Sequence, residues 1–291
     1  MKKMLCASLL LCISLSAFAQ WTMPPKGKSE SHTLESQVLN ASRNYTIYLP
    51  KSYTTDTTRT YPILYLFHGM SGTHDSWEKE GQVAAVANKL IDSGDAVEMI
   101  IVTPDAGGNV NTCQNGFFDM KNWPYETFFF TEFMPYIETH YRVKAEKAYR
   151  GISGLSMGGG GCTRYAQIHP ELFNTVYAMS ALMDIDQSNK FQGLDPNSLM
   201  GILTQSVIDN SCIAFVENAD EATKEKLRTV HWFVDCGDDD FLLKVNLDFF
   251  WAMKKAGIPL QFRMRDGGHD MEYWKSALYI ALPYFSNHFG R

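Results

Sequence analysis

Short apolar runs alternate with longer helical patterns along most of this chain, and no other feature of the sequence constrains its fold as strongly. A run of strand length that is mostly apolar, without polar residues at every second position, is typical of a strand buried on both faces of a sheet. The runs of this kind are residues 62–67, 97–103, 148–153 and 175–179. Two more follow at 230–236 and 260–264, and residues 43–49 alternate like a half-buried antiparallel strand.

Helical periodicity fills the intervals between these strands. The predicted helices lie near residues 80–92, 126–140, 157–168, 244–256 and 272–286. Strands that alternate with helices predict an α/β fold, with a mostly parallel sheet, right-handed crossovers and helices on both faces. Residues 183–228 are too long for a simple crossover. They predict a small helical insertion over one end of the sheet, where it is a candidate lid.

The N-terminal residues differ from the rest of the chain. Residues 1–19 combine a short basic end, an apolar run too short to span a bilayer, and small residues at Ala17 and Ala19. This pattern predicts a cleaved signal peptide and therefore a periplasmic or secreted protein. Residues 20–36 are rich in Pro, Ser, Lys and Gly, which favours a flexible leader. Residues 37–291 are then expected to form a single domain.

The charge of the chain limits its partners. With residues 1–19 removed, 24 basic and 32 acidic side chains remain, a formal charge of −8. A mildly acidic surface argues against nucleic acid or an anionic membrane as a partner, and the oligomeric state stays open. The remaining cysteines allow three disulfide pairings or free thiols, and none has the spacing of metal ligands: Cys113, Cys162, Cys212 and Cys236.

The motif that carries chemistry is Gly154-Leu155-Ser156-Met157-Gly158. It follows the apolar run 148–153 and precedes a helical pattern, which is the context of a nucleophile elbow. The turn from strand to helix is so sharp that the residues two before and two after the nucleophile must be small. Ser156 is therefore the candidate nucleophile.

A serine needs a base within hydrogen-bond reach. In the chain order Ser, acid, His, the histidines that follow the elbow by enough chain to be the last member are His269 and His288. His269 lies in a glycine-rich loop directly after the strand 260–264, where its side chain can turn over the end of the sheet. His288 lies at the end of an amphipathic helix, as surface histidines often do. His68 stands beside a glycine loop, where a structural role is expected. His269 is the candidate base.

The acid of such a triad is expected in the loop after the strand 230–236. That loop contains Asp238, Asp239 and Asp240, so the sequence offers three carboxylates for one role. The run could also be a solvated turn or a cation site. Asp240 is the first choice and Asp238 the second.

Two backbone N–H groups are needed to stabilise the oxyanion of the reaction. One is expected at Met157, directly after the nucleophile. The other is expected from Met70 or Gly69, in the loop that follows the strand 62–67. Four aromatic residues are candidates for substrate binding, although core packing explains such residues equally well: Phe117, Trp123, Tyr125 and Trp274.

Taken together, these segments resemble the esterase D and feruloyl esterase branch of the α/β-hydrolases, which includes carbohydrate esterase family one. The matching segments are residues 45–50, 61–69, 101–105, 154–159, 236–242 and 267–270. The resemblance implies the α/β-hydrolase fold and maps the triad onto Ser156, His269 and Asp240. The family includes enzymes that release feruloyl or acetyl groups from plant xylan, S-formylglutathione hydrolases and mycolyl transferases.

The expected protein is thus an exported serine esterase that acts through an acyl-enzyme on a small-molecule or polysaccharide ester. Removal of feruloyl or acetyl groups from plant polysaccharide is the first expectation, and no cofactor or metal is needed. An acyltransferase or an S-formylglutathione hydrolase-like thioesterase on the same fold remains an alternative. A non-catalytic carbohydrate-binding protein that inherited the fold is a further one.

Overall fold

A computed structural model describes residues 26–185 and 193–290 of the chain. The predicted signal peptide, residues 1–19, lies outside the described residues. The same holds for the first part of the predicted leader and for residues 186–192 of the candidate lid.

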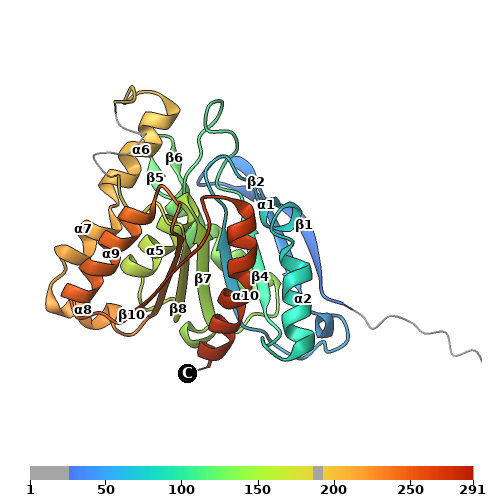
Figure 1. Cartoon of the computed structure of the whole chain (residues 1–291). Coiled ribbons are helices and arrows are strands. Elements are labelled where there is room, and N and C mark those ends of the chain that lie inside the picture. Colours follow the sequence, from blue (N-terminus) through green and yellow to red (C-terminus); the bar gives the residue numbers. More distant parts are fainter. Residues whose placement is uncertain (1–25, 186–192, 291) are drawn as a thin grey trace, which may run out of the picture.

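Within the described residues, eight strands form one sheet in the order β1-β2-β4-β3-β7-β8-β9-β10 (Figure 1). The first three strands of this order pair antiparallel, and the remaining pairs are parallel. The strands are β1 (Lys28–Ser36), β2 (Ala41–Leu49), β3 (Ile63–Phe67), β4 (Ile100–Pro104), β7 (Arg150–Leu155), β8 (Thr175–Met179), β9 (His231–Gly237) and β10 (Leu260–Arg265). A separate pair joins β5 (Asp119–Met120) to β6 (Trp123–Pro124).

Helices cover both faces of the sheet. They are α1 (Ser76–Lys79), α2 (Val83–Ser93), α3 (Tyr125–Phe128), α4 (Met134–His140), α5 (Met157–Ile168), α6 (Leu199–Asp209), α7 (Cys212–Glu217), α8 (Glu221–Leu227), α9 (Leu243–Lys255) and α10 (Met271–His288). Helices α2 and α10 lie side by side on one face, whereas α5 and α9 pack against the other (Figure 1). Helix α4 buries Met134 and Ile137 in the same core as α5. A π turn at Phe129–Phe133 joins α3 to α4, so the predicted helix 126–140 is continuous.

The alternation of side chains along each buried strand builds two cores. In β3, Ile63 and Phe67 point to the core beneath α5 and α9, while Leu64 and Leu66 point to the core beneath α2 and α10. Both sets are fully buried, as the apolar sequence of this strand predicts. The sheet and its two helical layers match the predicted α/β architecture.

The predicted flexible leader is wrong for its second half. Residues 28–36 form β1, which pairs antiparallel with β2 along its whole length, from Lys28 opposite Leu49 to Ser36 opposite Ala41. Most side chains of β1 are exposed or half-buried because the strand lies at the edge of the sheet. An edge strand of this kind lacks the apolar run by which the other strands are recognised, and its pairing is set by backbone hydrogen bonds.

The described part of the 183–228 insertion consists of the helices α6, α7 and α8, as expected. Serine and aspartate side chains cap their N-termini: Ser198, Ser211 and Asp220. The stretch 199–217 is long and apolar enough to cross a membrane by composition. In the structure a turn at Asn210–Ser211 divides it into α6 and α7, and both helices bury residues in the core on the α5 side.

Candidate active site

Ser156 occupies the sharp turn between β7 and α5. Its backbone has φ 53° and ψ −120°, a conformation that a serine adopts only under constraint, at a cost of about 1–3 kcal/mol. A Cβ atom on Gly154 would lie 2.4 Å from the carbonyl oxygen of Gly158, and one on Gly158 would lie 2.4 Å from the carbonyl oxygen of His68. The small residues of the motif are therefore required by close backbone packing.

The structure brings Ser156, His269 and Asp240 together in one hydrogen-bonded chain. His269 Nε2 lies 2.9 Å from Ser156 Oγ, and His269 Nδ1 lies 2.9 and 3.0 Å from the two Asp240 oxygens. A carboxylate only accepts hydrogen bonds, so Nδ1 carries the proton and Nε2 is left to accept from the serine hydroxyl. This arrangement can remove a proton from Ser156.

Asp240 is almost fully buried. Burial by itself would raise the pKa of its carboxyl. Hydrogen bonds from His269 and Ser180, together with the electrostatic attraction of His269, outweigh that effect and hold the pKa of Asp240 below its usual value. The carboxylate is therefore ionised at neutral pH and available to orient the imidazole.

The loops that carry the acid and the base follow neighbouring parallel strands, β9 and β10, and are held together by their backbones. The N–H of Asp239 donates to the carbonyl of Gly267, and the N–H of Asp238 donates to the carbonyl of Arg265. A Cβ on Gly237 would lie 2.1 Å from the Gly267 oxygen, so glycine is needed for this approach. Parallel strands thus place both loops at the same edge of the sheet.

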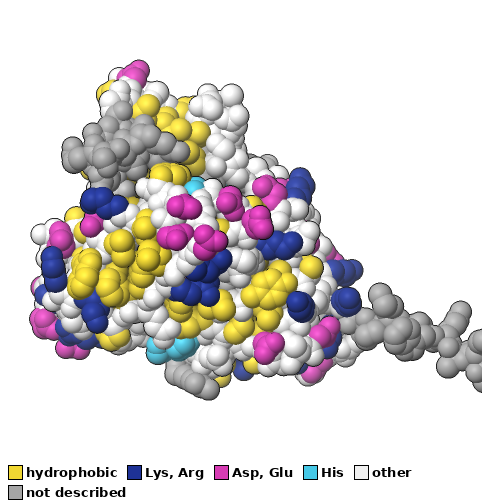
Figure 2. Space-filling model, viewed as in Figure 1, with side chains coloured by type: hydrophobic (Ala, Val, Ile, Leu, Met, Phe, Trp, Pro, Cys, Tyr) yellow, Lys and Arg dark blue, Asp and Glu magenta, His cyan; other side chains and the backbone are white. Residues whose placement is uncertain are grey.

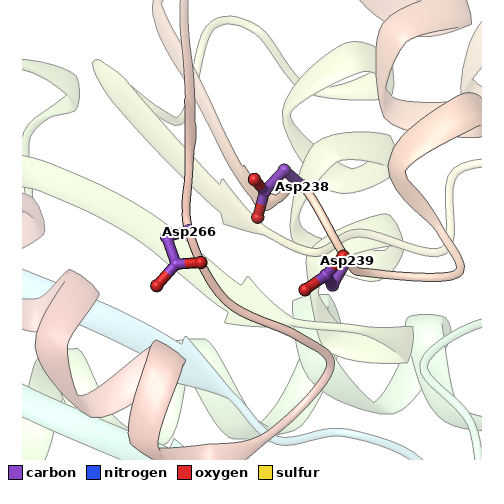
Figure 3. A group of neighbouring side chains, drawn as sticks. All are labelled: Asp238, Asp239 and Asp266. Atoms are coloured by element: carbon purple, nitrogen blue, oxygen red, sulfur yellow. The ribbon is translucent and has the colours of Figure 1, made fainter.

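Asp238, the second choice for the acid, has a different environment. It is exposed, and its Oδ1 accepts a hydrogen bond from the N–H of Gly267. Figure 3 shows its carboxylate beside those of Asp239 and Asp266, all exposed and within 4.8 Å of one another. A cation could be held there by geometry, yet exposed acidic groups are common without one. His269 has its partner in Asp240.

The loop proposed to supply the second oxyanion donor lines the same cavity as Ser156. Gly69 and Met70 both face this cavity, and the loop is fixed by the fully buried His68. His68 Nε2 accepts from the N–H of Ala106, so its Nδ1 carries the proton and donates to the carbonyl of Gly69 at 2.7 Å. Burial lowers the pKa of His68, which keeps the ring neutral in this structural role.

Met157, the other predicted donor, is the first residue of α5. The first N–H groups of a helix have no acceptor within the helix and carry its positive end, which suits them to stabilise a negative oxygen.

A cavity of about 340 Å³ opens beside Ser156 and His269. Its wall is mainly apolar, with a few polar groups such as Ser76 and Glu80. Cavities of this size with a small number of polar groups are typical of sites for small organic ligands. Among the described residues of the insertion, none from 193 to 228 lines the cavity, and its role as a lid stays a prediction.

Of the aromatic residues predicted to bind substrate, only Trp274 lines this cavity. The prediction is wrong for Phe117, Trp123 and Tyr125, which are buried in the core on the α5 side. Phe117 stacks on Phe67 with ring centroids 4.2 Å apart, and the Trp123 indole donates to the carbonyl of Gly116. Their loop turns inward because these rings gain more by packing than by facing solvent.

Sequence reasoning missed two aromatic residues of the cavity wall, Trp77 and Phe241. The ring of Phe241 lies 4.4 Å from that of His269. Its position directly after Asp240 was a signal that could have indicated its place.

Comparison with known proteins shows the family of the chain. The profile of a family described as "Putative esterase" matches residues 36–285, most of the chain. The protein belongs to this esterase family. It is 55% identical to a solved "ferulic acid esterase", with a TM-score of 0.89 over 91% of this chain and 100% of the other. The esterase is therefore a serine carboxylic-ester hydrolase with the α/β-hydrolase fold, as its resemblance to the feruloyl esterase branch implies.

Two curated relatives extend the comparison. An acetyl esterase of Caldicellulosiruptor saccharolyticus is 24% identical over 77% of this esterase and 82% of the relative. An esterase of Mycobacterium tuberculosis is 38% identical over 41% of this chain. That match covers 25% of the Mycobacterium protein, so this chain spans about a quarter of the relative's length.

Proposed function

We propose that this esterase is an exported enzyme that removes feruloyl or acetyl groups from plant polysaccharide or oligosaccharide, with Ser156, His269 and Asp240 as its catalytic triad. The observation that carries the proposal is the hydrogen-bond chain from the Ser156 hydroxyl through His269 to the buried Asp240. Each link has the polarity that proton removal from the serine requires.

The reaction proceeds in two steps through an acyl-enzyme. Ser156 Oγ attacks the ester carbonyl while its proton passes to His269 Nε2, and the imidazolium is stabilised by the Asp240 carboxylate. The carbonyl oxygen becomes negative and is stabilised by the N–H of Met157 together with that of Met70 or Gly69. His269 then gives its proton to the leaving alcohol. In the second step His269 removes a proton from water, which attacks the acyl-enzyme. His269 then returns this proton to Ser156 Oγ as the bond to the acyl group breaks and the acid is released.

The choice of acyl group is supported by the cavity beside Ser156. Its wall contains the aromatic residues Trp77, Phe241 and Trp274, which suit a planar aromatic acid better than a long flexible chain. The names of two similar proteins, a ferulic acid esterase and an acetyl esterase, point to the same two acyl groups. Export is supported by the signal-peptide pattern of residues 1–19.

The test is a substrate panel with a matched pair of variants. Wild type, Ser156→Ala and Ser153→Ala are compared on methyl ferulate, acetylated xylan and 4-nitrophenyl acetate. Ser153 is a buried serine on the same strand whose hydroxyl donates to the carbonyl of Tyr177. We expect Ser156→Ala to abolish turnover of all three esters and Ser153→Ala to retain it.

Two outcomes would contradict the proposal. Wild-type rates in the Ser156→Ala variant would rule out the nucleophile. Preference for S-formylglutathione over every oxygen ester, or for acyl transfer to a sugar acceptor over hydrolysis, would keep the triad and replace the proposed substrate and reaction.

A further inference from the structure

Ser180 lies beside the triad, although no step of the proposed mechanism uses it. It follows β8 directly, is fully buried, and has a left-handed backbone with φ 45°. Its N–H donates to the carbonyl of Asp235 at 2.7 Å, which ties it to β9, the strand that precedes Asp240. A serine in this conformation is uncommon and persists where its surroundings determine it, often at functional sites.

The hydroxyl of Ser180 receives a hydrogen bond from Trp274. The indole Nε1 lies 2.9 Å from Ser180 Oγ, and both residues are buried. An indole nitrogen only donates, so the oxygen of Ser180 is the acceptor and its proton is available to a second partner.

Hydrogen bonding from Ser180 acts to lower the pKa of two neighbouring acceptors, the Asp240 carboxyl and the Cys236 thiol. Burial raises the pKa of the Cys236 thiol, which therefore stays neutral. A charged acceptor forms the stronger hydrogen bond, so the proton of Ser180 is directed to Asp240.

Trp274 also contacts the reacting side of the site. Its ring lies edge-on to the imidazole of His269, with centroids 4.8 Å apart and planes at 89°, and it forms part of the cavity wall. One side chain therefore touches the substrate cavity, the base and, through Ser180, the acid.

We propose that Ser180 is a positioning residue of this esterase: its hydroxyl, oriented by the indole N–H of Trp274, holds the Asp240 carboxylate turned toward His269 Nδ1. The inference rests on the proposed triad. It adds a fourth side chain to the hydrogen-bonded chain and gives Trp274 a role besides that of cavity wall.

The pH profile of kcat/KM distinguishes a positioning role from a structural one, because loss of a serine with only a structural role would leave this profile unchanged. The titratable groups that face Asp240 are His269 and Cys236. Asp235, the residue before Cys236, bonds instead to the hydroxyls of Tyr177 and Tyr273 and forms an ion pair with Arg263. Removing the Ser180 hydroxyl takes a donor from Asp240 and makes its carboxylate more basic, so it holds the imidazolium more strongly. The acidic limb of the kcat/KM profile then moves to higher pH.

The experiment compares Ser180→Ala with Ser153→Ala on 4-nitrophenyl acetate over a range of pH. We expect Ser180→Ala to lower kcat about tenfold, the effect of roughly one lost hydrogen bond, with little change in KM. The midpoint of its acidic limb should rise by several tenths of a pH unit. Ser153→Ala removes a buried hydroxyl that bonds only to a backbone carbonyl, and neither quantity should change.

Trp274→Phe provides a second variant, with Trp123→Phe as its control. Phenylalanine keeps a ring against His269 but removes the N–H that orients Ser180. We expect a smaller shift of the acidic limb in the same direction. The double variant should shift no further than Ser180→Ala alone, because the indole acts through Ser180.

The proposal is overturned if Ser180→Ala keeps the wild-type kcat and pH profile, or if it only loses thermal stability. If Ser180→Ala does not fold, an unshifted profile in Trp274→Phe overturns it equally. The Ser156→Ala variant separates the two levels of inference. Activity in Ser156→Ala would refute the triad, whereas an inactive Ser156→Ala beside an unaffected Ser180→Ala would refute the positioning role alone.

Discussion

Two groups of aromatic side chains in this esterase are alike in composition and different in what surrounds them. The rim aromatics, which line the cavity, are Trp77, Phe241 and Trp274. The inner aromatics, which are buried in the core on the α5 side, are Phe117, Trp123 and Tyr125. Phe241 and Trp274 both contact the ring of His269. The inner aromatics contact one another, as Trp123 does by stacking on Tyr125.

Residue type alone therefore does not distinguish the wall of a binding cavity from a core. Phe241 and Trp274 contact the base, so these two contacts can serve the chemistry, whereas Trp77 lines the cavity and its indole donates to the carbonyl of Phe67. The inner aromatics fill volume beneath a helix, so their contacts serve stability. Phe241 is the exposed ring of the rim, so we expect a change there to alter kinetics with little effect on unfolding. We expect a change in the inner group to do the reverse.

The largest effect is expected at Asp240, the acid of the proposed triad. Asp240→Asn should lower kcat roughly 10³- to 10⁴-fold. The amide of asparagine can donate to His269 Nδ1, so the imidazole proton lies on Nε2, and Nε2 can then no longer accept the proton of Ser156. Asp238→Asn is the matched control and should retain kcat, since its carboxylate bonds to a backbone N–H. The measurement is steady-state kinetics on methyl ferulate. Equal losses in both variants would show that the acid is misassigned.

A change in the inner aromatics should act on stability. Trp123→Ala removes a buried ring and its hydrogen bond to the carbonyl of Gly116, and should lower the free energy of unfolding by about 3–5 kcal/mol. Activity per folded molecule should stay near that of wild type. Denaturant unfolding followed beside active-site titration measures both. A raised KM for methyl ferulate at unchanged stability would erase the distinction between the two groups.

The opposite pattern is expected at the rim. Phe241 is 49% exposed, so Phe241→Ala should change the free energy of unfolding by less than about 1 kcal/mol. Its ring lines the cavity and contacts His269, so kcat/KM for methyl ferulate should fall more than kcat/KM for 4-nitrophenyl acetate. The ratio of the two specificity constants is the measured quantity. An unchanged ratio would remove Phe241 from the acyl site.

The smallest effect concerns Glu126, the neighbour of Tyr125. Burial, reinforced by the charge of Asp119 and opposed by Arg164, raises the pKa of Glu126 to about 7. Between the ordinary pKa of 4.5 and about 7 the unfolded chain binds fewer protons at this site than the folded protein. Its contribution to stability is therefore present below pH 4.5 and is lost as the pH rises through 7.

Glu126→Gln should thus weaken the fall in Tm between pH 5 and pH 8, as measured by thermal unfolding. Glu225→Gln is a suitable control, because Glu225 is an exposed partner of Arg228 and such pairs contribute little. The same pH dependence in wild type and Glu126→Gln would show that Glu126 titrates normally.

Much of the fold could be predicted because buried strands and amphipathic helices are local patterns. The predicted helix 157–168 and strand 175–179 have the observed bounds of α5 and β8. The predicted strand 97–103 corresponds to β4, which begins three residues later, at Ile100. Val97 is exposed, and its N–H donates to the hydroxyl of Ser286. The leader was misassigned because β1 is an edge strand whose pairing leaves no apolar pattern.

Local sequence patterns predicted the alternation of most strands and helices along the chain and pointed to Ser156 and His269. Both signals are local. The strained turn at the nucleophile needs glycine two residues before and two residues after it, and the base lies in a glycine-rich loop directly after the strand 260–264. Tertiary structure alone decided which of three neighbouring aspartates meets His269, which aromatic residues face the cavity, and that Ser180 lies against Asp240. These depend on side-chain directions and on contacts between segments far apart in the chain, which one-dimensional spacing does not encode.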